Sequence, residues 1–204
     1  MYRLMIRLIP VFSVYLFNKN CENMNMSINL MTSNIRFENE ADDLFNWPNR
    51  KNFWASLINK NQIDILCTQE GREPQITDAN NLLKTLNLVQ SHREWIQERM
   101  YPSIFINPKK LSIQKSGDFW LSETPNVAGS KSFSSAFPRL CTWVLLKSIK
   151  FEFYVFNCHL DHILPETRSS QSLVLVEQIK KINHQNFPFF LVGDFNESPT
   201  GNVR

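Results

Sequence analysis

Two neighbouring apolar runs constrain the fold of this chain more than any other feature. Cys141–Leu146 and Phe151–Cys158 are apolar at nearly every position, and residues 147–150 between them suffice for a hairpin connection. A strand with one solvated face would alternate between apolar and polar residues, so we expect both strands to be covered on both faces of a sheet. A chain of 204 residues is large for one domain and short for two. We therefore expect one domain built around this buried sheet.

Other strands alternate with amphipathic helices. Apolar runs predict further strands at residues 28–32, 63–68, 103–106, 111–115 and 189–192. Apolar residues three and four apart predict helices at 50–60, 75–86 and 167–182. The first helix is expected to face inward with Phe53, Trp54, Leu57 and Ile58, and the last with Leu173, Val176, Ile179 and Ile182. With five glycines and no glycine-rich phosphate loop, the chain favours two packed sheets with outer helices over a nucleotide-binding doubly wound fold.

The net charge of the chain excludes no class of substrate and indicates none. The net charge is +3, and the basic residues are scattered along the chain instead of forming a run. The sequence therefore carries no strong electrostatic footprint for nucleic acid or for an anionic membrane. A polyanionic substrate is permitted but not indicated.

Cysteine usage favours a reducing compartment. No two of the four cysteines form a C-x-x-C pair, and Cys67, Cys141 and Cys158 lie inside apolar runs, where a buried reduced thiol is the ordinary outcome. We therefore expect the protein to be cytoplasmic.

The segment 1–25 leaves an alternative open, because it is either an apolar extension or a signal segment. Arg3 and Arg7 precede an apolar stretch that resembles the start of a secretory signal, which would make the protein secreted or periplasmic. No small-residue cleavage site follows, and the stretch is too short to span a bilayer. The other interpretation is an extension upstream of a start at Met24 or Met26.

Polar side chains gather where four of the predicted strands end. They are Asn34 and Arg36; Gln69 and Glu70; Asn157, His159, Asp161 and His162; and Asp194 and Asn196. Carboxylate and amide oxygens suit a hard cation such as Mg²⁺, which keeps several waters and borrows one or two protein carboxylates. An imidazole and a second carboxylate nearby can move protons or hold a phosphoryl group during attack by water.

Taken singly, each of these residues also has a purely structural interpretation. Asp194 and Asn196 would make side-chain turns after a strand, and Glu70 would be a solvated loop carboxylate. His159 would be a hydrogen-bonded structural histidine, and Arg139 would brace a loop. The functional interpretation depends on their occurring together at the ends of several strands.

Six motifs, taken in order, resemble those of the endonuclease/exonuclease/phosphatase superfamily, most closely its bacterial metal-dependent hydrolase branch. The motifs are TSNIRF (32–37), CTQE (67–70), FWLSETP (119–125), PRLCTW (138–143), FNCHLDH (156–162) and GDFNESP (193–199). The resemblance implies a DNase I-like, four-layer α/β sandwich of two mixed β-sheets with outer helices, occupying residues 26–204. It also implies a Mg²⁺-dependent phosphoesterase site, with Mn²⁺ as an alternative ion, at one end of the sheets.

The resemblance also implies roles for the strand-end residues. Glu70 and Asn34 match the family's metal-binding positions, and Asn34 also supports the phosphate. The catalytic residues implied are His159 at the scissile phosphate, with Asp194 and Asn196 orienting the attacking water. Three further positions are implied to contact substrate: Arg139, Asp161 and His162. The substrate is then a phosphoester, either nucleic acid, a phospholipid head group or a small phosphoester, and no stable protein partner is implied.

Two departures from the family pattern qualify this expectation. Cys158 stands where the family usually has Thr. The family also continues to a closing Ser-Asp-His motif, and nothing after Arg204 supplies it. We therefore expect a truncated sandwich, incomplete in its last strands. The alternative to a working hydrolase is a truncated, catalytically inactive family member or the product of an interrupted gene.

Overall fold

Two β-sheets face each other between outer helices in the computed structural model of the protein, which describes residues 15–17 and 27–198. The five-stranded sheet has the order β1 (Tyr15–Phe17), β9 (Phe189–Asp194), β8 (Glu152–His159), β7 (Leu140–Lys147), β6 (Ser112–Trp120). The four-stranded sheet has the order β2 (Leu30–Asn34), β3 (Ile65–Gly71), β5 (Tyr101–Ile106), β4 (Asn87–Leu88). Of the predicted N-terminal segment 1–25, all but residues 15–17 lies outside the described part.

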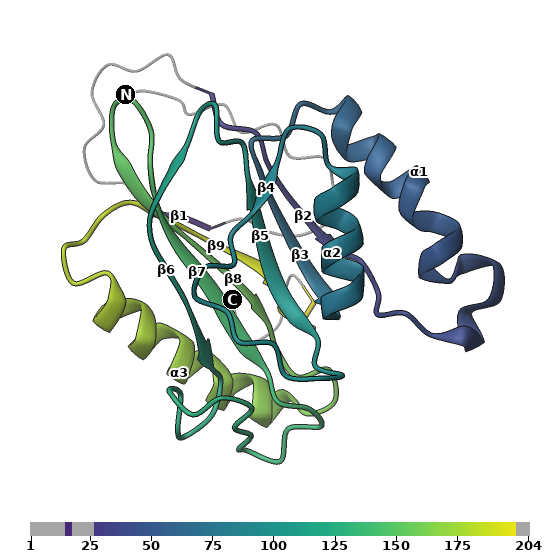
Figure 1. Cartoon of the computed structure of the whole chain (residues 1–204). Helices are drawn as coiled ribbons and strands as arrows, with labels where there is room; N and C mark the ends of the chain where they lie inside the picture. The colour runs from purple at the N-terminus through teal and green to yellow at the C-terminus, as the bar shows by residue number, and fades with distance from the viewer. Residues whose placement is uncertain (1–14, 18–26, 199–204) are drawn as a thin grey trace.

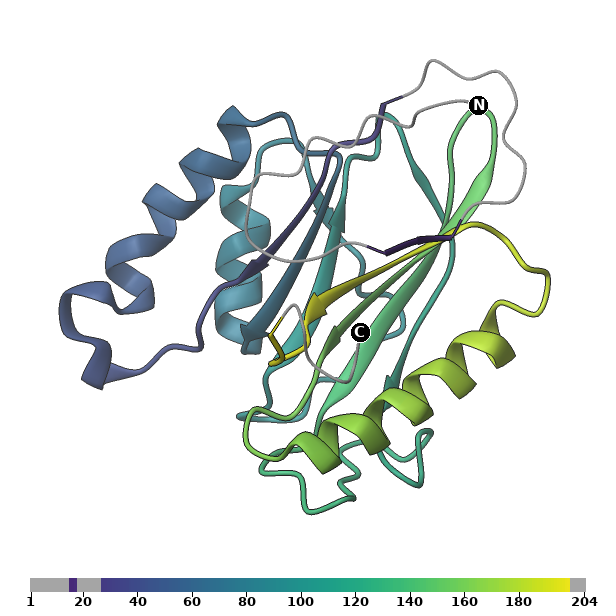
Figure 2. The ribbon, with the colours of Figure 1, turned by 180° about the vertical axis from the view of Figure 1, so that it is seen from behind.

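The helices form the outer layers. The 3₁₀-helix η1 (Glu40–Phe45) leads into α1 (Trp47–Lys60), which lies with α2 (Glu73–Leu82) over the four-stranded sheet (Figure 1). Helix α3 (Pro165–Ile182) lies over the five-stranded sheet on the opposite side of the molecule (Figure 2). The predicted four-layer sandwich is therefore confirmed. Both sheets are mixed, since β2–β3 and β8–β9 pair in parallel and the other described pairs are antiparallel.

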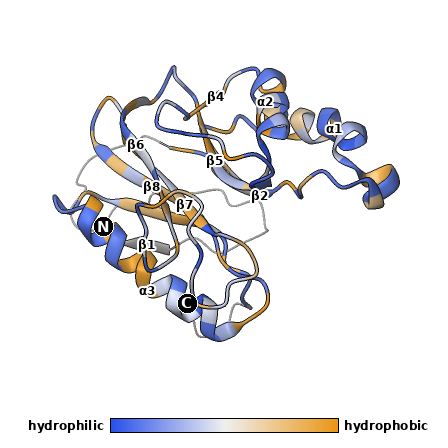
Figure 3. Ribbon diagram, turned by 60° about the horizontal axis from the view of Figure 1, so that its bottom comes forward, coloured by the Kyte–Doolittle hydropathy of each residue, from blue (hydrophilic) through white to orange (hydrophobic). Residues whose placement is uncertain are grey.

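Strand alternation divides the apolar residues among three layers of core. On β8, Phe153 and Val155 point between the sheets, whereas Tyr154 and Phe156 point towards α3. On β3, Leu66 packs under α1 and α2. Both faces of these strands are therefore buried, as the unbroken apolar runs predicted, and β7 and β8 form the predicted antiparallel hairpin. Figure 3 shows the apolar residues as orange along β7, with blue over much of α1 and α2.

The predicted inward faces of two helices are wrong in part. In α1, Phe53 is 69% exposed and Leu57 42% exposed. In α3, Leu173 is 74% exposed and Val176 46% exposed. Helix α3 instead buries Thr167, Arg168, Gln171, Leu175 and Ile179. The first half of this face is polar because it packs against hydrogen-bonding loops, so an apolar pattern alone could not identify it.

The three described cysteines are free and buried, as predicted. Burial raises the pKa of each thiol, so all three stay protonated and unreactive. Among the described residues, no helix is long and apolar enough to cross a membrane. The cytoplasmic location stays a prediction.

Candidate active site

Four strands deliver polar side chains to one end of the two sheets. Asn34 and Asp194 are the last residues of β2 and β9, His159 is the last residue of β8, and Glu70 is the last residue but one of β3. Parallel strands end at the same edge of a sheet, which brings each pair of neighbours together. In Figure 2 the purple arrow of β2 and the yellow arrow of β9 run towards the same end of the molecule. Each sheet therefore contributes two members to one cluster.

The cluster is held by one bridging amide. Asn34 donates from Nδ2 to Glu70 Oε1 at 2.8 Å and to Asp194 Oδ2 at 2.9 Å. His159 Nε2 lies 3.9 Å from the same Asp194 oxygen. Glu70, His159 and Asp194 each offer a ligand atom, and these atoms lie within 4.8 Å of one another. The structure thus brings together residues that are 160 positions apart in the sequence.

The Asn34 amide oxygen is already engaged, because it accepts from the backbone N–H of Arg36 at 2.9 Å. In this arrangement Asn34 positions the two carboxylates. Its role as a direct metal ligand stays a prediction.

Unusual backbone conformations aim two of the acidic side chains. Glu70 has φ = 67°, in the left-handed region that a residue with a β-carbon rarely adopts, and it lies where the β3–β5 register shifts. Such conformations cost of order 1–3 kcal/mol and persist where the surrounding structure enforces them. Gly193 has φ = +136°, and a β-carbon there would lie 1.9 Å from the carbonyl oxygen of Cys158. This close approach of β9 to β8 places Asp194 opposite His159 in the register.

Asn196 completes a turn after β9. Its backbone N–H donates to Asp194 Oδ1 at 2.9 Å, and its Nδ2 donates to the carbonyl oxygen of Leu160 at 2.9 Å. Like Glu70, it adopts a left-handed conformation, with φ = 49°. Asp194 is therefore fixed through both oxygens, one by Asn34 and one by this turn.

His159 is a buried neutral imidazole. Burial and the neighbouring Arg139 guanidinium lower its pKa to about 3, and Asp194 only partly opposes them. Arg139 Nη1 lies 3.0 Å from Nδ1 and 3.2 Å from Nε2 of His159, and the ring nitrogen without a proton accepts from it. Nε2 also faces Oδ2 of Asp194 at 3.9 Å.

Arg139 has a hydrogen-bond donor that the described residues do not use. A guanidinium has five N–H groups, and Nη1 and Nη2 meet His159 and His162 at 3.0 and 3.2 Å. Its Nε is buried with no hydrogen-bond partner among the described residues. A planar cation with free donors matches the geometry of a phosphate oxygen pair.

Asp161 lies near Arg139 and His159, and four hydrogen-bond donors hold its carboxylate. Its Oδ1 accepts from the N–H groups of Ile163 and Leu164 at 2.8 and 3.0 Å. Its Oδ2 accepts from Ala136 N at 2.8 Å and Ser135 Oγ at 3.1 Å. Burial raises the pKa of this carboxyl, but the four donors outweigh that effect and lower it. Asp161 is fully buried and ties two loops together, and its contact with substrate stays a prediction.

Two buried amides behind the cluster connect the sheets. Asn157 accepts from Gln69 Nε2 at 2.8 Å and donates to the carbonyl oxygens of Thr68 and Ser103, both at 2.9 Å. Both amides stand among the polar residues that the sequence places at strand ends. Gln69 and Asn157 lie on β3 and β8, close to the residues Glu70 and His159 on the same strands. Their hydrogen bonds therefore join the two sheets next to the cluster.

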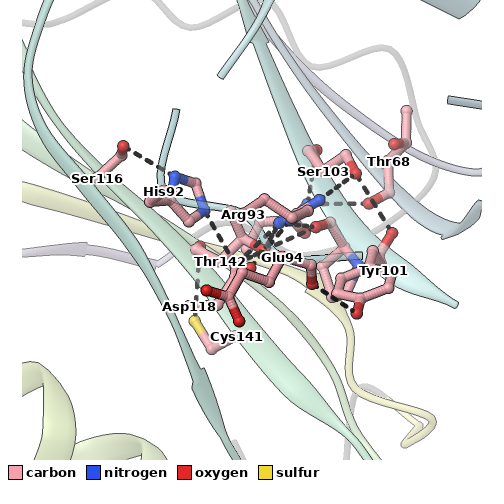
Figure 4. A network of polar contacts seen from close by, with 12 residues as sticks. Thr68, His92, Arg93, Glu94, Tyr101, Ser103, Ser116, Asp118, Cys141 and Thr142 are labelled. Atoms are coloured by element: carbon pink, nitrogen blue, oxygen red, sulfur yellow. Dashed lines mark hydrogen bonds and ion pairs between the residues drawn. The ribbon is translucent and has the colours of Figure 1, made fainter. Parts of the chain in front are cut away.

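A second polar cluster lies deeper between the sheets (Figure 4). Arg93 donates to both oxygens of Asp118, at 2.9 and 2.8 Å, and to Ser103 Oγ at 2.9 Å. Thr142 Oγ1 donates to Asp118 at 2.6 Å, and His92 Nε2 lies 3.3 Å from the same carboxylate. The sequence did not predict this network, because its members come from three strands and a loop, and only Thr142 lies in one of the six motifs.

The donor set at the strand ends fits a hard divalent cation. Glu70 and Asp194 supply carboxylate oxygens, which Mg²⁺ and Mn²⁺ prefer, and His159 is neutral. The two carboxylates repel each other, and among the described residues no cation pairs with either of them within 4 Å. A cation between them would remove this repulsion.

Most of the chain is similar to proteins of one family. The model of the endonuclease/exonuclease/phosphatase family matches residues 31–203. A mannosyl-6-phosphatase of Bacteroides thetaiotaomicron is 31% identical, with a TM-score of 0.80 over 87% of this chain and 68% of that one. A protein of unknown function from Enterococcus faecalis is 32% identical, with a TM-score of 0.78 over 85% of this chain and 69% of that one.

Among curated proteins, an uncharacterised protein of Acanthamoeba polyphaga mimivirus is 28% identical over 174 residues, or 78% of this chain. The chain spans 63% of the length of that relative.

Proposed function

The chain belongs to the endonuclease/exonuclease/phosphatase family, and from this premise we propose that it is a metal-dependent hydrolase of phosphoesters. The observation that carries the proposal is the convergence of Glu70, His159 and Asp194 with a bridging Asn34 at one end of the sandwich. The similarity to a mannosyl-6-phosphatase supports a phosphoester as the substrate.

The reaction is the attack of water on phosphorus, in which a new P–O bond forms and the ester P–O bond breaks. Glu70 and Asp194 would hold the ion, Mg²⁺ or Mn²⁺, which supplies positive charge beside the nonbridging oxygens. The protein's own contribution is positioning and electrostatic stabilisation, because phosphoryl transfer needs little covalent chemistry.

The individual roles follow from the contacts. Asp194 accepts a hydrogen bond from the attacking water and, with Asn196 fixing its orientation, aligns that water with phosphorus. His159 donates its ring N–H to a nonbridging oxygen, as a neutral donor that needs no change of protonation. Arg139 places its positive charge beside the same phosphoryl group through its contact with His159. The attacking water loses a proton to solvent, and the departing oxygen takes one from solvent and leaves as the alcohol.

Phosphoester hydrolysis by the purified chain tests the proposal. We expect turnover of 4-nitrophenyl phosphate or bis(4-nitrophenyl) phosphate with Mg²⁺ or Mn²⁺, and none with a chelator. Glu70→Gln should abolish turnover, whereas Glu73→Gln, at an exposed carboxylate on the following helix, should leave it unchanged. Turnover that survives the chelator, or that survives Glu70→Gln, would contradict the proposal.

A further inference from the structure

An aromatic pair stands at the rim of the site. Phe137 and His162 stack with ring centroids 5.9 Å apart and an interplanar angle of 19°. Phe137 is 45% exposed, and His162 is exposed. Single exposed apolar side chains are common on protein surfaces, so exposure alone decides nothing. This pair is distinguished by its position beside the site where the phosphoryl group of the substrate is proposed to bind.

Arg139 connects the pair to the cluster. Its guanidinium carbon lies 5.8 Å from the centroid of the Phe137 ring. One terminal nitrogen contacts His162 at 3.2 Å, and the other contacts His159 at 3.0 Å. A single cation thus separates the imidazole of the cluster from the aromatic pair. A phosphoryl group bound against Arg139 and His159 would direct one ester substituent towards Phe137.

The loop that carries Phe137 is held in place. The Ser135 hydroxyl lies 2.7 Å from the Phe137 carbonyl oxygen and 3.1 Å from Asp161 Oδ2 and donates its one proton to either, while Asp161 also accepts from the backbone of Ala136. Gln171 on α3 donates to Ser135 Oγ at 3.1 Å. These contacts fix the ring before any ligand arrives, so its ordering imposes no cost on binding.

The loop also carries strain of the kind found at functional sites. The two residues before Ser135, Phe133 and Ser134, both adopt left-handed conformations, with φ of 58° and 57°. Thr167 on α3 donates to the Phe133 carbonyl oxygen, which anchors the start of this strained turn. Several buried polar groups therefore maintain a conformation that displays an apolar ring to solvent.

We propose that Phe137 and His162 form a stacking subsite for a planar aromatic ring in the substrate's leaving group. The inference rests on the proposed function, since it places the ring on the far side of Arg139 from the phosphoryl group. An aromatic face stacks with any heteroaromatic or aryl ring of the ligand. Phe137 is 45% exposed and is therefore open to such a ring, and among the described residues Arg139 is the cation that lies over its face.

Two ligands that differ only by a ring test the subsite. Adenosine 5′-monophosphate and ribose 5-phosphate present the same primary phosphoester, but only the first carries a planar base. Binding is measured by calorimetry in a chelator, where the proposed hydrolysis does not run, and kcat/KM is measured with Mg²⁺. We expect the nucleotide to be preferred by at least about fivefold in both measurements. A comparison of phenyl phosphate with methyl phosphate then shows whether an aryl ring without a sugar is enough to produce the preference.

Substitutions assign the preference to the pair. Phe137→Ala should reduce the preference to within about twofold, and Phe137→Trp should retain it. Phe53→Ala, which removes an exposed ring from α1, is the matched control and should change nothing.

A wild-type protein without the preference, or a preference that survives Phe137→Ala, would overturn the subsite. An equal loss of both ligands in Phe137→Ala would also overturn it, because the ring would then act only on the loop or on the sugar. Absence of turnover with every phosphoester contradicts the proposed function, while the calorimetric ratio still decides the subsite.

Discussion

The two polar clusters between the sheets differ in how their charges are balanced. In the Arg93 network, the carboxylate of Asp118 is paired with a guanidinium through both oxygens (Figure 4). At the strand ends, the carboxylates of Glu70 and Asp194 share one neutral amide instead. The first carboxylate has a cation in direct contact, whereas among the described residues no cation lies within 4 Å of either carboxylate of the second cluster and Arg139 attracts both only from farther away.

This difference separates a structural role from a functional one. A paired buried charge stabilises the fold when its remaining hydrogen bonds are made, as those of Arg93 are. Like charges held together instead cost stability, and the fold tolerates them where they serve function. Substitutions in the two clusters should therefore produce opposite signatures, the first in stability and the second in activity.

The largest effect should come from breaking the paired cluster. Arg93→Met removes the partner of a buried carboxylate and should lower the free energy of unfolding by about 3–5 kcal/mol in urea denaturation. The Arg93 side chain is 0% exposed, so solvent cannot replace it. Lys115→Met, at an exposed position on β6, is the control. A loss no larger than that of the control would mean that the network contributes nothing.

Neutralising the unbalanced cluster should have the opposite outcome. Asp194→Asn should lower kcat by about 100-fold or more, because a group positioned at the reacting phosphoryl is lost. The free energy of unfolding should fall by much less than in Arg93→Met, because the loss of one of two repelling charges offsets the one hydrogen bond lost at the replaced oxygen. Phosphate release and urea denaturation on one preparation measure both quantities. A destabilised but fully active variant would reverse our assignment of the two clusters.

Acid should weaken the paired cluster within a defined range. Burial raises the pKa of Asp118, but the contacts with His92 and Arg93 outweigh it and lower the folded-state value to about 2, against 3.8 for the unfolded chain. The unfolded state therefore binds the proton first, and the stability from this group is lost as pH falls from about 3.8 towards 2. The loss amounts to about 2 kcal/mol.

Urea denaturation between pH 5 and 2 measures this slope, in steps that bracket both pKa values. Asp118→Asn removes the titrating group and should flatten that part of the curve. An unchanged slope in the variant would show that other carboxyls are responsible.

The sandwich was predictable because burial on two faces leaves a trace in sequence. The runs that became β7 and β8 are apolar at almost every position, and only a covered sheet explains that pattern. The strand-end residues Glu70, His159 and Asp194 were also predictable, since strand ends in a layered sheet meet at one edge. The roles of these three residues were predicted from the family motifs, because a pattern of apolar residues does not indicate a catalytic role.

Other features depend on partners far apart in the chain. Arg93 and Asp118 are 25 residues apart, and nothing near either residue indicates the other. The inward face of α3 begins with the polar residues Thr167, Arg168 and Gln171, so its apolar positions misled the prediction. Asp161 was assigned to substrate because it lies in a motif, although its contacts bind neighbouring loops.

The smallest predicted effect tests the missing charge of the unbalanced cluster directly. Mg²⁺ at ten times its dissociation constant should stabilise the folded protein by about 1.4 kcal/mol, which a modest rise in Tm reports. Glu70→Gln should abolish the rise, because a neutral amide replaces one of the two carboxylates. Glu73→Gln should keep it. Arg93→Met should lower the Tm of the protein without Mg²⁺ but should show the same rise in Tm with Mg²⁺. The reason is that the paired cluster contributes to stability but not to binding of the ion. If the Arg93 variant lost the rise as well, the two clusters would be one coupled unit, and charge balance would no longer distinguish them.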